Sequence, residues 1–349
     1  MSYNRWTLAT LAWFLLATPA EAQVSDAADP LFQGTDVVEV RLVAPIDTIL
    51  SSREDSTQFE GKLLYVDDAG NNTELDVEIR TRGKFRLQED VCAFPPLRLN
   101  FKKSQTDGTL FDKQDKLKLV THCKDRSARY EQTLLREYLV YRILNQLTDI
   151  SFRVRLLRIT YEDTDASNQP RVVYGFVVEH KDRLAKRTGL EVLEAESIDV
   201  SDLEPRYMNL VSVFHFLIGN TDFSPVAGPN DTCCHNHVLL GRDGELAYSV
   251  PYDFDQAGLV DAPHAAANPR FKLRSVRQRL YRGRCQNNQL LDETPDEYRQ
   301  QRGAILQLSE EQVGLTDATR QKVGKYITQF YEIIDSPKLL DRKLVKKCI

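Results

Sequence analysis

The stretch KLKLVTHCKDRSARYEQTLLREYLVYRILNQL, residues 116–147, changes its hydrophobic period from that of a strand to that of a helix. Leu117 and Leu119 alternate with lysines, which is typical of a strand with one buried face. From Ala128 to Leu147 there is no Gly or Pro, and apolar residues recur at helical spacing. The stretch therefore predicts a strand followed by a long helix, and it places the chain in the α+β class.

Alternating segments of the same kind lie on both sides of this stretch. Before it, apolar and polar residues alternate in 38–42, 75–79 and 97–101, with turn-forming residues between the segments. After it, we expect two further strands at 152–161 and 171–179. The pattern predicts an antiparallel, β-rich first half with one inserted helix.

The second half is richer in predicted helix. Pro205 fits a helix start and is followed by an apolar stripe, and Thr316 can cap another amphipathic helix near the end. Between them, 237–240 and 245–250 read as two short strands around a turn. The change of character predicts a boundary between two lobes at 179–182.

The N-terminus has the features of a cleavable signal peptide. Arg5 precedes a nearly unbroken apolar run at 8–17, and small residues at Ala20 and Ala22 suit a signal peptidase. The run is short for a membrane anchor, so we expect cleavage after Ala22. The mature chain would begin at Gln23, be secreted or lie in the periplasm or cell envelope, and not stay inserted in a membrane.

Composition limits the classes of partner. The 349 residues are 42% hydrophobic and 28% charged, as in ordinary globular proteins, and the formal net charge is −5. Nucleic-acid binding usually needs a basic patch or stripe. The acidic balance therefore gives no support to a nucleic-acid partner.

The six cysteines all follow the predicted cleavage site, and an even number in an exported chain favours disulfides. Cys92 and Cys123 both lie in the strand-rich half, so we expect them to pair. The alternative is a zinc site in the run Cys233-Cys234-His235-Asn236-His237. Its spacing differs from that of the usual structural zinc ligands, so we favour disulfides.

The segment 217–255 carries the residues best suited to chemistry. A helix is expected to end at Gly219-Asn220-Thr221-Asp222, and a hairpin leads to Tyr252-Asp253-Phe254-Asp255. Since a hairpin returns the chain to its start, Asp222, Asn236 and Asp253 can converge. Two carboxylates and an amide oxygen suit a hard cation such as Mg²⁺. Each residue could instead be an ordinary cap or turn former.

The first half offers cations for phosphate groups. Arg80 and Arg82 should share one face of a strand, and Lys84 follows Gly83. Lys118 lies on the strand before the long helix, and Glu137 lies within that helix. A strand lysine paired with a helix glutamate can hold phosphates, although charges on the open face of a sheet can also be merely solvated.

The order of these motifs resembles the CotH family of atypical, secreted spore-coat kinases, over about residues 80–258. The resemblance is carried by four motifs in order: Arg82-Gly83, Tyr174-Gly175 leading to Glu179, Gly219-Asn220-Thr221-Asp222, and Pro251-Tyr252-Asp253-Phe254-Asp255. The last two motifs are the distinctive ones. The chain departs from ordinary kinases in having no Gly-rich phosphate loop, and an insertion at 225–234 precedes Asn236.

The resemblance implies a role for each matching residue. Asp222 would be the catalytic carboxylate, Asp253 the principal metal ligand, and Asn236 a second ligand. Asn230 or Asn220 could serve in place of Asn236. Asp255 would be a further ligand. The segment around Glu179 would be the hinge beside the adenine, and Arg82, Lys84, Lys118 and Glu137 would complete the nucleotide site.

The resemblance further implies a two-lobed, atypical protein-kinase-like fold. An antiparallel β-rich N-terminal lobe at 23–179 would sit over a mainly helical C-terminal lobe at 180–349. The expected activity is transfer of a phosphoryl group from ATP or another nucleotide, with Mg²⁺ or Mn²⁺, to a hydroxyl of a protein or small molecule. The alternatives are a catalytically inactive binding or assembly protein of the cell envelope, and an exported metallohydrolase that uses Asp222, His235, His237 and Asp253.

Overall fold

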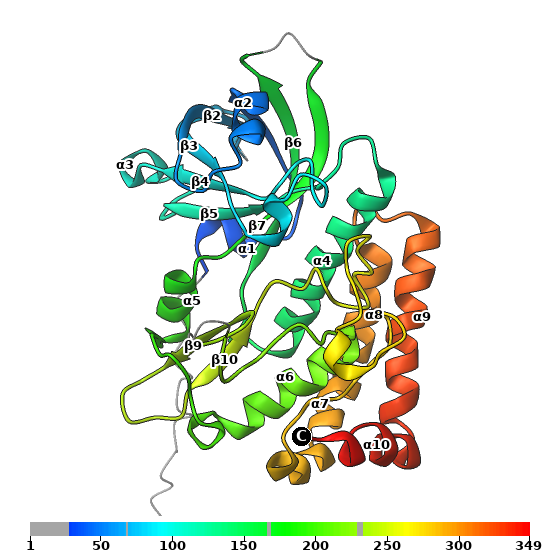
Figure 1. Cartoon of the computed structure of the whole chain (residues 1–349). Coiled ribbons are helices and arrows are strands. Elements are labelled where there is room, and N and C mark those ends of the chain that lie inside the picture. The colour runs from blue at the N-terminus through cyan, green and yellow to red at the C-terminus, as the bar shows by residue number, and fades with distance from the viewer. Residues whose placement is uncertain (1–27, 68, 166–168, 229–232) are drawn as a thin grey trace, which may run out of the picture.

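The first half of the chain forms a closed β-barrel in the computed structural model, which describes residues 28–67, 69–165, 169–228 and 233–349 (Figure 1). Around the barrel the strand order is β1-β2-β3-β4-β5-β7-β6. The strands are β1 (Val38–Ala44), β2 (Phe59–Val66), β3 (Asn72–Thr81), β4 (Leu97–Phe101), β5 (Lys116–Val120), β6 (Val154–Asp163) and β7 (Arg171–Val178).

The barrel overturns the two-lobed, kinase-like fold expected from the sequence. Strands β1 and β6 pair in parallel from Val38↔Leu157 to Ala44↔Asp163, and this pairing closes the sheet. The other neighbouring strands of the barrel are antiparallel. Alternation in the sequence shows which side chains of a strand point inward. It does not show that the first and sixth strands meet, so an antiparallel lobe of a two-lobed, kinase-like fold was the wrong prediction.

The barrel has its own core. The apolar residues of the alternating segments point inward, including Val40 and Leu42 of β1, Ile79 of β3 and Leu99 of β4. Strand β2 was not foreseen, although its register with β3 runs from Phe59↔Ile79 to Val66↔Asn72. The faces of β1, β3, β4 and β5 were predicted correctly because inward residues alternate with outward ones.

Helices cover one side of the barrel and extend away from it (Figure 1). Helix α4 (Ala128–Leu147) has the predicted bounds, and α6 (Pro205–Ile218) begins at the predicted proline. The Thr316 side chain caps α9 (Asp317–Ile334), as expected. The other helices are α1 (Pro30–Gln33), α2 (Ile46–Ser52), α3 (Lys103–Thr106), α5 (Lys181–Thr188), α7 (Thr294–Gln300), α8 (Arg302–Glu311) and α10 (Pro337–Lys343).

A second core joins the barrel to the helices. Helix α4 contacts β6 and β7 on one side and α8 on another. Outward-facing Phe176 and Val178 of β7 belong to the same apolar cluster as residues of α4, α6 and α9. The boundary expected at 179–182 falls between β7 and α5, and it stays a prediction because this core continues on both sides of it.

A small three-stranded sheet lies beside α6. It consists of β8 (Glu191–Leu193), β9 (His237–Gly241) and β10 (Tyr248–Pro251), in the order β10-β9-β8. Strands β9 and β10 form the predicted hairpin, with His237 opposite Pro251. This hairpin carries the chain back to the end of α6, where the acidic motifs were expected to meet.

Three cysteine pairs lie at disulfide distance. Cys92 pairs with Cys123, as predicted, Cys285 pairs with Cys348, and the adjacent Cys233 and Cys234 pair with each other. The pairing of Cys233 with Cys234 removes both thiolates from the zinc site considered for that run. In the described part of the chain, no cluster of three or more His, Cys, Asp or Glu side chains could hold a metal ion.

The predicted signal peptide lies outside the described residues, as does Asn230, one of the alternative ligands. Within 28–67, 69–165, 169–228 and 233–349, none of the helices is both long and apolar enough to span a bilayer.

Candidate functional site

The motif Gly219-Asn220-Thr221-Asp222 directly follows α6, and Gly219 is the C-cap residue of that helix. Gly219 has φ +68°, and its N–H bonds to the carbonyls of His215 and Phe216. A Cβ at this position would collide with the Tyr326 hydroxyl, so both conformation and space require glycine. The Asn220 side chain then accepts a hydrogen bond of 2.9 Å from the backbone N–H of Asp222. The turn thus fixes where the Asp222 carboxylate emerges.

Two neighbours from the next segment hold the Asp222 carboxylate. His235 Nε2 lies 2.9 Å from Asp222 Oδ1, and Asn236 Nδ2 donates to Asp222 Oδ2 at 3.1 Å. The hydrogen bond to Asp222 raises the pKa of His235 and outweighs the opposing effect of burial. The Asp222 and His235 side chains are 37% and 38% exposed, so this pair is open to a ligand.

The hairpin brings the second acidic motif beside the first, as predicted. The backbone N–H of Tyr252 bonds to the carbonyl of Asn236 at 2.9 Å. Asp253 follows with φ +61°, and its N–H donates to the Tyr141 hydroxyl of α4 at 2.9 Å. The Asp253 charge is close enough to contribute to the raised pKa of His235. Asp222, Asn236 and Asp253 therefore share one region.

Phe254 anchors this motif in the helical core. Its side chain is fully buried, and its ring centroid lies 4.7 Å from that of Tyr141 and 5.5 Å from that of Phe214. Because Phe254 points into the core, the carboxylates of Asp253 and Asp255 are left on the other side, toward the barrel.

Arg86 fills the space between these carboxylates, and sequence reasoning missed it. Its Nη2 lies 3.1 Å from Asp253 Oδ1, its Nε lies 3.4 Å from Asp255 Oδ2, and its Nη1 lies 3.6 Å from Glu137 Oε2. The Arg86 side chain is only 10% exposed. We call Arg86, Glu137, Asp253 and Asp255 the Arg86 cluster. One guanidinium thus joins the barrel end, α4 and the second acidic motif.

The four side chains of the Arg86 cluster shift one another's pKa values. Burial alone would lower the pKa of Arg86, but the three carboxylates raise it. Burial raises the pKa of Glu137 to about 8, against the effect of Arg86. Burial and the charge of Asp255 raise the pKa of Asp253. Burial would also raise the pKa of Asp255, but Arg86 and a hydrogen bond with His264 lower it.

Two predicted phosphate-binding cations face this cluster. Lys118 lies with its Nζ 4.7 Å from the ring centroid of Tyr252, and burial and the charge of Arg82 lower its pKa to about 8. Burial also lowers the pKa of Arg82, which the charge of Asp253 opposes. Neither cation forms an ion pair with a carboxylate of the described residues. Both are therefore available to an anionic ligand.

Lys84 and Glu179, which were also expected in the nucleotide site, take no part in the ion pairs of the Arg86 cluster. Lys84 is exposed just before a 3₁₀ turn, η1 (Phe85–Leu87), which carries Arg86. Glu179 is buried, and both of its oxygens accept from Arg187, at 3.0 Å each. Its carboxylate also accepts from the backbone N–H of Arg153. The Glu179 carboxylate thus takes part in a buried ion pair with Arg187. A hinge beside the adenine would have to use the backbone of this segment.

The predicted metal ligands differ in their free oxygens. Asp253 uses Oδ1 for Arg86, and Asn236 uses its Nδ2 for Asp222, so Asp253 Oδ2 and Asn236 Oδ1 have no hydrogen bond to a described residue. Asp255 Oδ2 contacts both Arg86 Nε and His264 Nε2. Oxygens of Asp253 and Asn236 thus fit a hard cation, whereas Asp255 Oδ2 holds Arg86 and His264 in place.

The histidines of the alternative metallohydrolase point to different surroundings. His235 faces Asp222, but His237 is buried with its Nε2 3.1 Å from His215 Nε2 and its Nδ1 3.0 Å from the Ser249 hydroxyl. Burial lowers the pKa of His237 to about 3. The structure therefore brings His235 to the site and places His237 in the core.

The residues that sequence reasoning missed come from turns. Arg86 follows Gly83, whose φ of +103° starts the turn after β3. His264 Nε2 lies 3.1 Å from Asp255 Oδ2, and among the described residues its buried Nδ1 has no hydrogen-bond partner. No periodicity marks such turn residues as partners of distant carboxylates.

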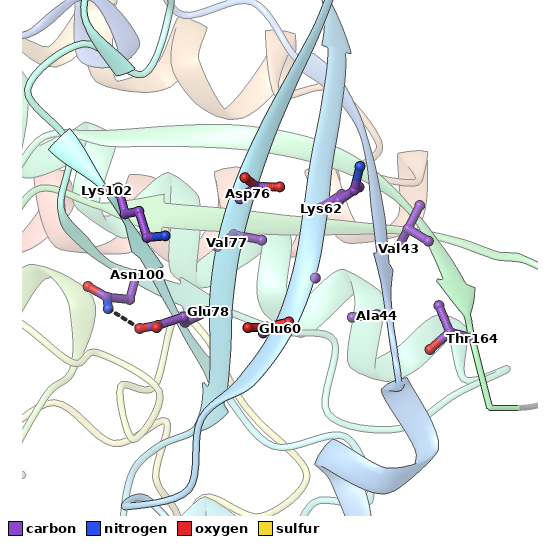
Figure 2. Close-up of a pocket in the computed structure, with 11 residues that line it drawn as sticks. Val43, Ala44, Glu60, Lys62, Asp76, Val77, Glu78, Asn100, Lys102 and Thr164 are labelled. Carbon is purple, nitrogen blue, oxygen red and sulfur yellow. Dashed lines mark hydrogen bonds between the residues drawn. The ribbon is translucent and has the colours of Figure 1, made fainter. Parts of the chain in front are cut away.

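A separate pocket of about 500 Å³ lies on the outer face of the barrel. Figure 2 shows charged side chains of β2 and β3 around it, together with Lys102 just after β4, and a hydrogen bond of 2.6 Å from Asn100 to Glu78. The pocket is lined by Val43, Ala44, Glu60, Gly61, Lys62, Asp76, Val77, Glu78, Asn100, Lys102 and Thr164. None of these residues belongs to the Arg86 cluster or to the Asp222 pair.

Comparison with known proteins leaves the family open. No protein-family model matches the chain, and a search of curated proteins finds no match either.

Proposed function

We propose that this protein is an exported phosphotransferase that moves a phosphoryl group from a nucleotide to a hydroxyl of a protein or small molecule. The observation that carries the proposal is the placement of Asp253. Its free Oδ2 lies in a region that also contains Arg82 and Lys118, two cations without a carboxylate partner among the described residues. Carboxylate oxygen beside unpaired cations is what a metal-bound phosphate needs.

Each residue has a role in this proposal. A divalent metal would supply positive charge against the phosphate oxygens, and Asp253 and Asn236 have the free oxygens to hold it. Arg82 and Lys118 bind phosphate oxygens directly. Asp222, held by His235 and Asn236, orients the acceptor hydroxyl and takes its proton as the new O–P bond forms. The bond from phosphorus to the nucleotide's bridging oxygen breaks, and the nucleoside diphosphate leaves.

The three cysteine pairs support the exported location. Disulfides persist in oxidising compartments and are rare in the cytosol. The predicted signal peptide agrees with this location, and both features favour an acceptor in the cell envelope or outside the cell.

The proposal is tested by nucleotide-dependent stability. The chain from Gln23 is melted with ATP or ADP, with and without Mg²⁺ or Mn²⁺. Binding at a hundred times the dissociation constant adds about 2.7 kcal/mol. We expect stabilisation that needs both nucleotide and metal and that disappears in Asp253→Asn.

The matched control is Asp243→Asn, which removes the same charge from an exposed turn of the β9–β10 hairpin. It should keep the nucleotide effect. If the folded wild-type chain shows no shift with any nucleotide and metal, the phosphotransferase proposal is wrong, and a non-catalytic binding or assembly protein becomes the better account.

A further inference from the structure

Three basic residues stand side by side across neighbouring barrel strands. The register places Arg80 of β3 directly opposite Arg98 of β4, and Arg98 directly opposite Lys118 of β5. Directly opposite residues share one face of a sheet. We call Arg80, Arg98 and Lys118 the basic row.

The basic row lies on the outside of the barrel. The residues that alternate with it, Ile79 and Leu99 among them, are fully buried in the barrel core. Arg82, two residues beyond Arg80, continues on the outer side. The row is thus a surface feature that ends, through Lys118 and Arg82, at the candidate site.

Several outward charges of the barrel are paired, whereas the basic row is not. Lys62 of β2 pairs with Glu74 of β3, and Arg41 of β1 pairs with Glu162 of β6. Within the described residues, no member of the basic row forms an ion pair, and Arg98 Nε is buried without a partner. Like charges directly opposite one another destabilise a sheet. An arrangement of this kind is relieved when an anion binds.

The pKa shifts of these side chains also indicate that the cations lie close together. Burial lowers the pKa of Arg98, and the charge of Arg80 adds to this effect, whereas the charge of Asp55 opposes it. Arg98 in turn contributes to the lowered pKa of Lys118 and of Arg82. Lys118 and Arg98 also act on His180, at the start of α5. The cations are therefore near enough to share one ligand.

The length of the row indicates the form of that ligand. Adjacent strands are about 4.8 Å apart, so three strands span roughly 10 Å. One phosphate or carboxylate can contact one or two of these side chains, whereas a chain of linked phosphates can contact all three. The row also leads toward Asp253, where a terminal phosphate would meet the metal ligands.

We propose that the basic row binds a chain of linked phosphate groups and extends the phosphate site of the candidate phosphotransferase over the outer face of β3, β4 and β5. This inference rests on the proposed function, because it names the phosphate-bearing substrate of that site. A nucleoside triphosphate and an inorganic polyphosphate share this chemistry.

The test is binding of sodium tripolyphosphate to the full mature chain, measured by calorimetry at fixed ionic strength. Arg98→Gln should weaken binding about tenfold, because it removes charge-assisted hydrogen bonds. Arg80→Gln is a second variant, should the first fold poorly. Arg41→Gln removes an equal charge from the other side of the barrel, and its affinity should stay within about twofold of wild type.

Orthophosphate and ATP separate the remaining outcomes. Orthophosphate should compete weakly, and equal competition by orthophosphate would overturn the proposal in favour of a single-anion site. Wild-type affinity in both Arg98→Gln and Arg80→Gln would also overturn it. ATP that binds more tightly than tripolyphosphate identifies a nucleotide as the source, and equal or weaker binding identifies the inorganic chain.

Failure of this inference can be told apart from failure of the proposed function. Tripolyphosphate binding that depends on Arg98, in a protein that never transfers phosphate, refutes the function and leaves the phosphate-chain site. Phosphoryl transfer that depends on Asp222 but is the same in Arg98→Gln refutes the phosphate-chain site alone.

Discussion

Arg86 Nη2 lies 3.1 Å from Asp253 Oδ1, so the carboxylate best placed to hold a metal is already bound through one oxygen to a buried arginine. The ion pair leaves Asp253 Oδ2 free and fixes its direction. Because Arg86 also contacts Glu137 and Asp255, the same guanidinium joins η1 of the barrel half to α4 and to the acidic motif. The barrel and the candidate site are thus coupled through one side chain.

Replacing Arg86 should be strongly destabilising. Arg86→Met leaves three carboxylates close together without a counter-charge, and breaking a buried pair in this way costs about 3–5 kcal/mol. The matched control is Arg41→Met, since Arg41 is 54% exposed in its pair with Glu162, and such pairs contribute about 0–1 kcal/mol. Urea unfolding of both variants measures the difference. Equal losses in the two would show that the Arg86 cluster is not a buried charge network.

The same variant should be more damaged at high pH than at low pH. Without Arg86, the pKa of Glu137, already raised to about 8 by burial, rises further. The folded state then binds more protons than the unfolded state between the unfolded pKa near 4.5 and the folded value, so stability falls as pH rises. Unfolding at pH 5.5 and pH 8.5 checks this sign. A loss that is independent of pH would contradict it.

His235 reports on Asp222 without any ligand. The hydrogen bond to Asp222 raises the pKa of His235 above 6.5. The pair therefore stabilises the fold fully below pH 6.5, and this contribution is lost as pH rises through the folded pKa. In Asp222→Asn the neutral amide removes the charge, and the His235 pKa should fall toward its ordinary value. NMR titration of the ring protons measures it.

His180 provides the internal control for that titration. Burial lowers the pKa of His180. The charges of Lys118, Arg98 and Lys181 lower it further, and Asp182 opposes them, whereas Asp222 is not among the charges that act on this histidine. Its titration should be unchanged in Asp222→Asn. Equal movement of both histidines would mean that the variant perturbs the whole fold rather than one hydrogen bond.

Local patterns in the sequence predicted most individual helices and strands correctly. They did not predict that the strands close into a barrel. The run without Gly or Pro at Ala128–Leu147 fixed α4, and Pro205 fixed the start of α6. Closure of the barrel depends on β1 meeting β6, and the parallel partners Val40 and Ile159 are far apart in the chain. Neither strand carries a signal that names its partner, so the overall fold was predicted wrongly.

The residues of the candidate site likewise include some that local sequence patterns predicted and some that they did not. Asp222, Asn236 and Asp253 were expected to converge because one hairpin connects them, and it does so. Arg86 comes from a turn after β3, and only the three-dimensional fold brings it to α4 and to Asp255. The ion pair between Glu179 and Arg187 was likewise not predicted, because Arg187 lies on α5, a helix that was not predicted from the sequence.

Lys118 should make the stability of the protein rise in alkaline solution. Its folded pKa is lowered to about 8 from 10.5, so between these values the folded state binds fewer protons than the unfolded state. Stability therefore rises with pH across this window, by up to about 3 kcal/mol. Lys118→Met removes the titrating group, and the difference between wild type and variant should shift in favour of wild type from pH 7.5 to pH 10. An unchanged difference would place Lys118 in free solvent.

The disulfide between Cys92 and Cys123 should support both the fold and the site. The two residues are 31 apart in sequence, and closing a loop of this size stabilises the fold by about 4 kcal/mol in the chain-entropy model. The Cys92 carbonyl and the Leu87 carbonyl both accept from Arg53 Nη1, so the bridge is tied to η1, which carries Arg86. Replacing both cysteines by serine should lower stability and also weaken metal-dependent nucleotide binding.

The pair Cys285 and Cys348 offers the matched control, because it closes a loop of 63 residues at the far end of the chain. Its double serine variant should lose about as much stability, again about 4 kcal/mol, since the entropic effect grows only slowly with loop length. It should nevertheless keep nucleotide affinity, because no residue of the Arg86 cluster lies within that loop. If both double variants lose affinity alike, the effect follows from global stability, and the Cys92–Cys123 bridge has no special link to Arg86.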